Sequence, residues 1–221
     1  MQQISDKMAG LYVHIPFCKS RCIYCAFYST TSAGMEEKYV SALCRELDLR
    51  SDYCSPEWQT VYIGGGTPST LSPEQLQRLF SHIDCSHATE VTIECNPDDV
   101  TPSFASLLVS LPVNRVSMGA QTFDDSRLGF LRRRHNAAEV VNAVNTLRDA
   151  GIDNISIDLI YGFPGESLKQ WDDDITAALS LGVEHLSAYC LSYEEGTPLY
   201  RMLKEGKVEE SDDELTRAMY Y

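Results

Sequence analysis

The sequence predicts an α/β protein built around one parallel sheet. Short apolar, β-branched runs alternate with longer amphipathic runs along most of the chain, and the connections between them are short. This alternation is typical of βαβ units. At 221 residues the chain is long enough for a sizeable core, because a domain of this size buries about 70% of its unfolded surface. Six such units fit either a doubly wound open sheet or an incomplete (β/α) barrel.

The expected elements follow one another in a regular order. Strands are expected at residues 11–15, 60–63, 90–94, 115–118, 155–160 and 185–190. Helices are expected at 35–50, 73–83, 102–111, 137–150 and 168–181, with a further polar helix beginning near Asp212. Ser72, with a proline next and Gln75 at the capping-box position, predicts a helix start. Gly151 and Gly182 stand where glycine commonly ends a helix.

The composition favours some functions and excludes others. The formal net charge is −14, with 18 Lys and Arg against 32 Asp and Glu. An acidic surface repels phosphate backbones, so nucleic acid is not expected as a partner; the only basic cluster is 132–135. No apolar stretch approaches the roughly 20 residues that span a bilayer, and no signal-peptide pattern is present. Eight cysteines without such a signal indicate a reducing compartment, and we expect the cytoplasm.

Three cysteines follow the first expected strand with the spacing C-x3-C-x2-C: Cys18, Cys22 and Cys25. Thiolates are soft ligands for iron–sulfur clusters, zinc and copper(I). A structural zinc site usually takes four ligands in two pairs, and no second pair is present. An iron–sulfur cluster normally takes four cysteines, so three indicate one iron with an exchangeable ligand. A structural zinc site on a binding module stays open as an alternative, as do incidental buried cysteines.

Further notable residues fall at the carboxyl ends of the other expected strands. The turn Gly64-Gly65-Gly66-Thr67-Pro68 follows the second strand, Glu94 ends the third, Gln121 follows the fourth and Asp158 lies within the fifth. Glycine lets a backbone approach a ligand closely, and the Gly-Lys-Ser/Thr ending of a P-loop is absent. A carboxylate in a buried strand requires a partner. Both possible folds bind ligands at this sheet edge, so these residues predict one site.

The cysteine spacing, with an aromatic residue before the last cysteine, resembles the radical S-adenosylmethionine (SAM) superfamily. The segments 12–18, 64–68, 94–97, 115–121 and 158–164 together resemble the oxygen-independent coproporphyrinogen III oxidase family. The resemblance implies a [4Fe-4S] cluster whose open iron binds SAM, in an incomplete parallel (β/α)6 barrel of radical SAM type. It also implies an N-terminal lead at 1–10, a radical SAM core at 11–211 and, at 212–221, the start of a C-terminal region that is otherwise missing.

The resemblance also assigns cofactor contacts, whereas it assigns no catalytic residue. Contacts with the SAM on the cluster are implied for Tyr12, Gly65 and Glu94. A second SAM site is implied for Tyr24, Gly66, Thr67, Gln121, Arg133 and Asp158, with Ser192 as a weaker match. Each has a structural alternative: the tyrosines can be core aromatics, Gln121 a helix cap and Arg133 part of a solvated helix face.

Two departures from the oxidase pattern point to one branch of the family. The oxidizing enzymes show a fourth cysteine shortly after the triplet, but here Cys25 is followed by Ala26, Phe27 and Tyr28, and the longer N-terminal arm is absent. Both features resemble the haem-chaperone (HemW-type) branch. The implied partners are haem or porphyrin(ogen), a reductase or a flavodoxin/ferredoxin-type electron donor, and a haem-accepting protein.

Whether the chain is an enzyme stays open at this point. The alternative is an oxygen-independent coproporphyrinogen III dehydrogenase, which converts two propionates to vinyl groups by oxidative decarboxylation. A tRNA-modifying radical SAM enzyme is a third hypothesis, which the acidic charge of −14 disfavours.

Overall fold

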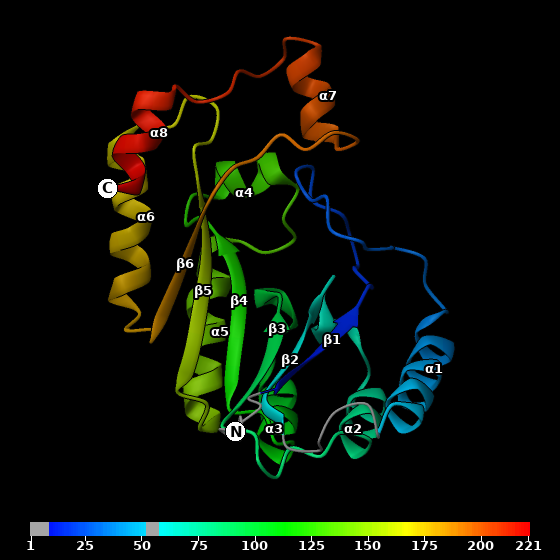
Figure 1. Cartoon of the computed structure of the whole chain (residues 1–221). Coiled ribbons are helices and arrows are strands. Elements are labelled where there is room, and N and C mark those ends of the chain that lie inside the picture. Colours follow the sequence, from blue (N-terminus) through cyan, green and yellow to red (C-terminus); the bar gives the residue numbers. More distant parts are fainter. Residues whose placement is uncertain (1–8, 52–57) are drawn as a thin grey trace, which may run out of the picture.

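A computed structural model describes residues 9–51 and 58–221 (Figure 1). Cys54 and residues 1–8 of the expected lead lie outside the described residues. Six parallel strands form one sheet in chain order. They are β1 (Ala9–Ile15), β2 (Trp58–Gly65), β3 (Glu90–Cys95), β4 (Arg115–Gln121), β5 (Asn154–Tyr161) and β6 (His185–Cys190).

The strand order decides between the two predicted architectures. A doubly wound sheet reverses its order at a switch point, whereas this sheet runs from β1 to β6 without reversal, with β1 and β6 as its edges. The curved sheet carries its helices on the outer face (Figure 1). The prediction of an α/β fold of the incomplete (β/α)6 barrel type is confirmed.

Five of the expected helices cover the outer face, and a sixth closes the described chain. They are α1 (Glu36–Leu49), α2 (Pro73–Ser81), α3 (Pro102–Ser110), α5 (Ala137–Ala150), α6 (Leu168–Ser180) and α8 (Asp213–Tyr220). Ser72 and Gln75 form the predicted capping box, and Asp212 is the N-cap of α8. Trp171 of α6 donates through Nε1 to the carbonyl of Met219 at 2.8 Å, which holds α8 against α6. The division at residue 212 into two regions stays a prediction.

Two short helices and two 3-10 turns were not expected from the sequence. The helices are α4 (Asp125–Leu131) and α7 (Pro198–Lys204), and the turns are η1 (Pro68–Thr70) and η2 (Pro97–Asp99). Seven residues make barely two turns, which is too short for a clear 3.6-residue period. Figure 1 shows α4 and α7 beyond the carboxyl ends of the strands, the end where ligands bind in such folds.

The expected boundaries were wrong mainly at strand ends. The fourth strand was expected to end at Met118 but runs to Gln121, and the second runs two residues further in each direction than expected. Gly119, Ala120 and Gln121 lack the β-branched or aromatic side chains that signal a strand. The β4–β5 register also shifts between Gly119 and Gln121, and Gln121 has a φ of 71°. This local bulge turns the end of β4 toward the cavity described below.

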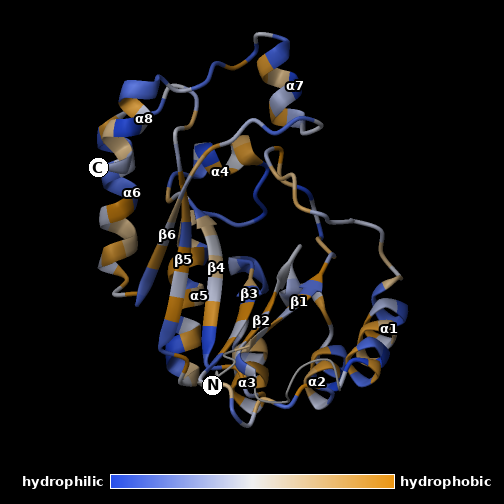
Figure 2. Cartoon of the chain, in the orientation of Figure 1, coloured by the Kyte–Doolittle hydropathy of each residue, from blue (hydrophilic) through white to orange (hydrophobic). Residues whose placement is uncertain are grey.

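The main core lies between the sheet and the outer helices. Hydrophobic residues colour much of β2 to β5, while the helices alternate between hydrophobic and hydrophilic positions (Figure 2). Val61, Ile63 and Ile93 are fully or almost fully buried there, and each such side chain stabilises the fold by about 1.5–3 kcal/mol. Because side chains alternate along a strand, the opposite face is left to polar groups, among them Glu94 and Asp158.

A buried ion network fastens the loop after β5. Arg127 of α4 pairs with Glu166 and, at 3.1 Å, with Asp174 of α6. Asp174 also accepts hydrogen bonds from Thr122 Oγ1 at 2.7 Å and from the Phe123 backbone N–H at 2.8 Å. Both carboxylates are nearly inaccessible to solvent, at 0% and 2% exposure, so the network is a structural connection between α4 and α6.

No helix in residues 9–51 and 58–221 is long and apolar enough to cross a membrane.

Candidate functional site

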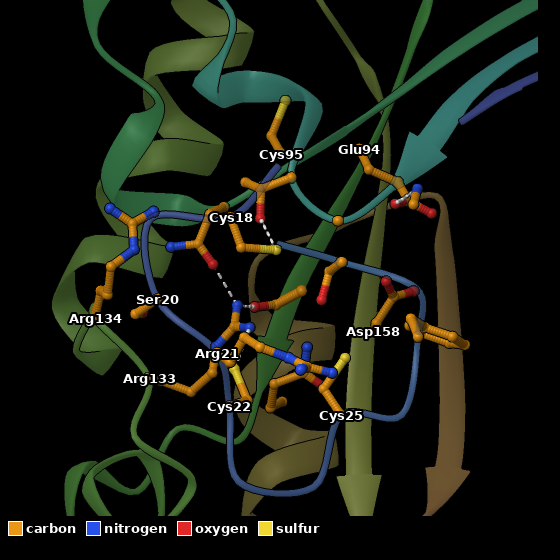
Figure 3. Close-up of a pocket in the computed structure, with 18 of the residues that line it drawn as sticks. Cys18, Ser20, Arg21, Cys22, Cys25, Glu94, Cys95, Arg133, Arg134 and Asp158 are labelled. Carbon is orange, nitrogen blue, oxygen red and sulfur yellow. Dashed lines mark hydrogen bonds between the residues drawn. The ribbon is translucent and has the colours of Figure 1, made fainter. Parts of the chain in front are cut away.

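One cavity opens at the carboxyl ends of the strands, between the cysteine loop and the ends of β2 to β5 (Figure 3). Eleven of the twelve predicted site residues line it, and Tyr12 is the exception. These eleven are Cys18, Cys22, Tyr24, Cys25, Gly65, Gly66, Thr67, Glu94, Gln121, Arg133 and Asp158. Residues up to 140 positions apart in the sequence therefore face one space.

Backbone hydrogen bonds hold the cysteine loop in place at several points. At its start, the Cys18 N–H donates to the Thr30 carbonyl at 2.9 Å. In its middle, the Ile23 N–H donates to the carbonyl of Leu131 in α4 at 3.2 Å, and the Leu199 N–H of α7 donates to the Ile23 carbonyl at 3.0 Å. A second, smaller apolar cluster that includes these three side chains packs beneath the loop. The two unexpected helices thus support the cysteines.

Two of the three thiols already receive hydrogen bonds. Thr67 Oγ1 donates to Cys18 Sγ at 3.4 Å, and Arg133 Nη1 donates to Cys22 Sγ at 3.4 Å. Burial is the main cause that raises the pKa of Cys25. Hydrogen-bond donors such as Thr67 and Arg133 stabilise thiolates, which carry negative charge as ligands. They also tune the properties of the cluster that the thiolates bind. The cysteine surroundings therefore fit an iron–sulfur cluster.

The thiols do not meet at one point. In the described part of the chain, no three His, Cys, Asp or Glu side chains converge closely enough to hold a single metal ion. In an iron–sulfur cluster each thiolate binds a different iron. The cysteine sulfurs of a cluster site therefore lie further apart than the ligands of a single metal ion.

The glycine turn is pressed against the cysteine loop. The Gly66 N–H donates to the Ile15 carbonyl at 2.7 Å. A Cβ added at Gly66 would lie 2.8 Å from the Phe17 carbonyl oxygen and 3.0 Å from Cys18 Sγ. Gly65 has a φ of +118°, which side-chain-bearing residues rarely adopt. Both positions need glycine, and the backbone of the turn is left open toward the cavity.

Two partly buried carboxylates face the same space. Glu94 accepts from Tyr62 Oη at 2.8 Å and from the Gly65 N–H at 2.9 Å. Burial raises the pKa of Glu94, and the nearby charge of Asp158 adds to this effect. Burial also raises the pKa of Asp158 itself. A cationic or hydrogen-bond-donating ligand in the cavity would satisfy both groups.

Tyr12 lies on β1 beside the cavity. Its side chain is 57% exposed, its hydroxyl lies 3.0 Å from His14 Nδ1, and its ring stacks on Tyr62 with 6.0 Å between ring centroids. Because Tyr62 donates a hydrogen bond to Glu94 at the cavity, the ring of Tyr62 lies between Tyr12 and the cavity. His14 is hydrogen-bonded on both ring nitrogens, by Tyr12 and by the Tyr28 carbonyl at 2.9 Å.

Arg133 lies at the cavity rather than on a solvated helix face (Figure 3). Its Nη2 donates to the Gly119 carbonyl at 2.6 Å and to Asn96 Oδ1. Its Nε is buried without a hydrogen-bond partner among residues 9–51 and 58–221. Burial raises the pKa of the Tyr24 hydroxyl nearby, with the charge of Arg133 opposing that effect.

Some lining residues were missed by the sequence reasoning. Asn96 and Arg134 line the cavity, and Ser117 and Gly119 on β4 complete its floor. Asn96 lies in the segment 94–97 that carried the resemblance, but it was given no role there.

A second cavity adjoins the first, between β5, β6 and the cysteine loop. Ser192, the weaker match, lines this second cavity and not the first. The residues common to both cavities are Tyr24, Cys25, Phe27, Glu94, Ser117, Gln121 and Asp158. The residues that the resemblance assigns to a second SAM site therefore line a space that continues toward β6.

Comparisons with known proteins agree with this architecture. The family model for the radical SAM superfamily matches residues 12–178. The Bacillus subtilis protein named heme chaperone HemW is 38% identical over 221 residues, covering 96% of this chain and 58% of that protein. A Bos taurus protein named radical S-adenosyl methionine domain-containing protein 1, mitochondrial, is 32% identical, covering 97% and 50%.

A solved structure shares the fold. Coproporphyrinogen III oxidase (HemN) from Escherichia coli superposes with a TM-score of 0.83 at 23% identity, covering 96% of this chain and 50% of that one. The chain thus spans between 50% and 58% of the length of these relatives. The matched family, the identities and the cysteine site agree: the chain belongs to the radical SAM superfamily and matches its HemW-type branch.

Proposed function

We propose that the chain binds a [4Fe-4S] cluster through Cys18, Cys22 and Cys25 and binds SAM at the fourth iron. The observation that carries this proposal is the convergence of all three cysteines with the glycine turn and two partly buried carboxylates on one cavity. When bound, the cluster and SAM supply one-electron chemistry that no side chain can provide. A reducing location such as the cytoplasm suits exposed thiolate ligands.

The chain's own residues would bind and orient these groups. Thr67 and Arg133 donate to two of the cysteine sulfurs, which stabilises thiolates at the cluster. The open backbone of Gly65 and Gly66 lets a ligand approach closely. Glu94, which is partly buried and lines the cavity, would accept hydrogen bonds from a bound SAM.

We further propose that the whole protein handles haem, as the names of its HemW relatives indicate. The second cavity supports this proposal, because Tyr24, Phe27 and Tyr189 supply aromatic rings suited to a flat, apolar macrocycle. Phe27 and Tyr189 are 70% and 57% exposed, so a ligand can reach them. In this proposal the protein transfers haem to an acceptor protein and receives electrons from a flavodoxin-, ferredoxin- or reductase-type donor.

Anaerobic reconstitution tests the cluster. We expect about four irons and four sulfides per chain, with a visible spectrum that changes on SAM addition. Cys22→Ala should lose the cluster, whereas Cys85→Ala, at a half-buried cysteine outside the cavity, should keep it. One tetrahedral zinc and no iron would contradict the proposal.

Haem handling is tested separately on the protein extended to the length of its relatives. We expect stable haem binding and transfer to an apo-acceptor. Conversion of coproporphyrinogen III to protoporphyrinogen in the presence of SAM and a reductant would instead show the dehydrogenase.

A further inference from the structure

A carboxylate outside the predicted site residues connects the segments around the cysteines. Asp99 is the last residue of η2, and its side chain is only 2% exposed. Its Oδ1 accepts from Lys19 Nζ at 2.6 Å. Its Oδ2 accepts from Ser69 Oγ at 2.8 Å and from Arg134 Nη2 at 3.2 Å. One buried group therefore joins the cysteine loop, η1 and the connection between α4 and α5.

Each residue that bonds Asp99 lies close in the chain to a cysteine or to a residue that contacts a cysteine sulfur. Two of these groups donate hydrogen bonds to a cysteine sulfur, and the third is a cysteine itself. The neighbours are Cys18 for Lys19, Thr67 for Ser69, and Arg133 for Arg134. A change at Asp99 therefore reaches Cys18 and Cys22 through three separate segments.

The positive charges around Asp99 explain why a carboxylate occupies this position. Lys19 and Arg134 bring two positive charges to the loop, and Arg134 is shared between Asp99 and Asp98, with Asp98 Oδ2 at 2.6 Å. Hydrogen bonds between charged groups are stronger than neutral ones, and burial of one partner strengthens them further. If the carboxylate is made neutral, the pairing with Lys19 is lost and that side chain is free to turn into solvent.

We propose that Asp99 is the positioning residue of the cysteine loop, which holds Cys18 and Cys22 in the arrangement that takes up the cluster. The identity of the bound group rests on the proposed function, whereas the anchoring itself does not. Partners that orient metal ligands without touching the metal typically contribute about 10- to 100-fold to metal affinity.

The first experiment uses the iron-free chain. Asp99→Asn is compared with Asp174→Asn, a change at an equally buried carboxylate whose partners Thr122, Phe123 and Arg127 lie outside the cysteine loop. Alkylation of Cys18 and Cys22 is followed by mass spectrometry. We expect about tenfold or faster alkylation in Asp99→Asn, because hydrogen bonds to charged groups contribute about that factor. Asp174→Asn should have a much smaller effect, since its network reaches the cysteine loop only through α4.

The second experiment uses the reconstituted chain. Loss of iron to a chelator under anaerobic conditions should be about 10- to 100-fold faster in Asp99→Asn and should change much less in Asp174→Asn. Lys19→Met removes the same ion pair from a side chain that is 55% exposed, so it should fold normally and shift both readouts in the same direction.

The result that would contradict the proposed function differs from the results that would contradict the role of Asp99. A parent chain that takes up no iron contradicts the proposed function, and the alkylation rates still decide the role of Asp99. Equal effects of the two asparagine variants, or parent-like alkylation in Asp99→Asn, would overturn the anchoring role.

Discussion

Gly66 offers a direct test of the contact between the glycine turn and the cysteine loop. In Gly66→Ala the new Cβ would lie 2.8 Å from both the Pro16 carbonyl carbon and the Phe17 carbonyl oxygen. Contacts below 3.0 Å are essentially never seen for a Cβ, and both atoms belong to the backbone. The loop must therefore retreat by about 0.2–0.6 Å, and overpacking of this kind destabilises by about 1–3 kcal/mol.

The matched control is Gly129→Ala in α4. A Cβ at Gly129 meets no heavy atom within 4 Å, and alanine stabilises a helix over glycine by about 0.8–1 kcal/mol. The two variants add the same methyl group and should change the free energy of unfolding in opposite directions.

Urea unfolding of the iron-free chain measures both effects. With a denaturant slope of about 2 kcal/mol/M, the midpoint should fall by roughly 0.5–1.5 M for Gly66→Ala and rise by roughly 0.5 M for Gly129→Ala. Reconstituted Gly66→Ala should also retain less iron than the parent. A parent-like midpoint for Gly66→Ala would refute the close contact, since a methyl group would then fit where the structure leaves no room.

Three further predictions concern single side chains. Arg133→Gln removes the donor to Cys22, so iron loss to a chelator should be about tenfold faster. Burial, then the Arg133 charge, lowers the pKa of His135 to about 4 from 6.5. The unfolded chain therefore takes up this proton first, and the fold loses stability as pH falls from 6.5 toward 4. His135→Gln should remove up to about 3 kcal/mol of that pH dependence in urea unfolding. Ser72→Ala removes the N-cap that accepts from the Gln75 N–H, and the unfolding free energy should fall by about 1 kcal/mol.

The elements predicted with the right bounds include one long, capped helix and one short strand. The helix Ala137–Ala150 and the strand His185–Cys190 have the expected bounds. Helices α4 and α7 were missed because each has only seven residues and no room for a repeating apolar stripe.

The convergence of the site residues was predictable from the topology of the sheet. In a parallel sheet the strand ends meet at one edge, so Thr67, Glu94 and Asp158 converge whatever the helices do. Asp99 was not predictable, because a carboxylate in a short turn carries no periodic signal, and only the fold brings Lys19 and Arg134 to it.

Departures from ordinary local rules gather around the same cavity. Gln121 has a φ of 71° where glycine is favoured, and such a conformation costs about 1–3 kcal/mol. Glu94 and Asp158 are partly buried carboxylates whose pKa values burial raises, and the buried Nε of Arg133 has no hydrogen-bond partner among the described residues. Groups of this kind stabilise the fold only when a bound ligand satisfies them. The chain that holds both the cluster and SAM should therefore be more stable to unfolding than the iron-free chain with SAM alone.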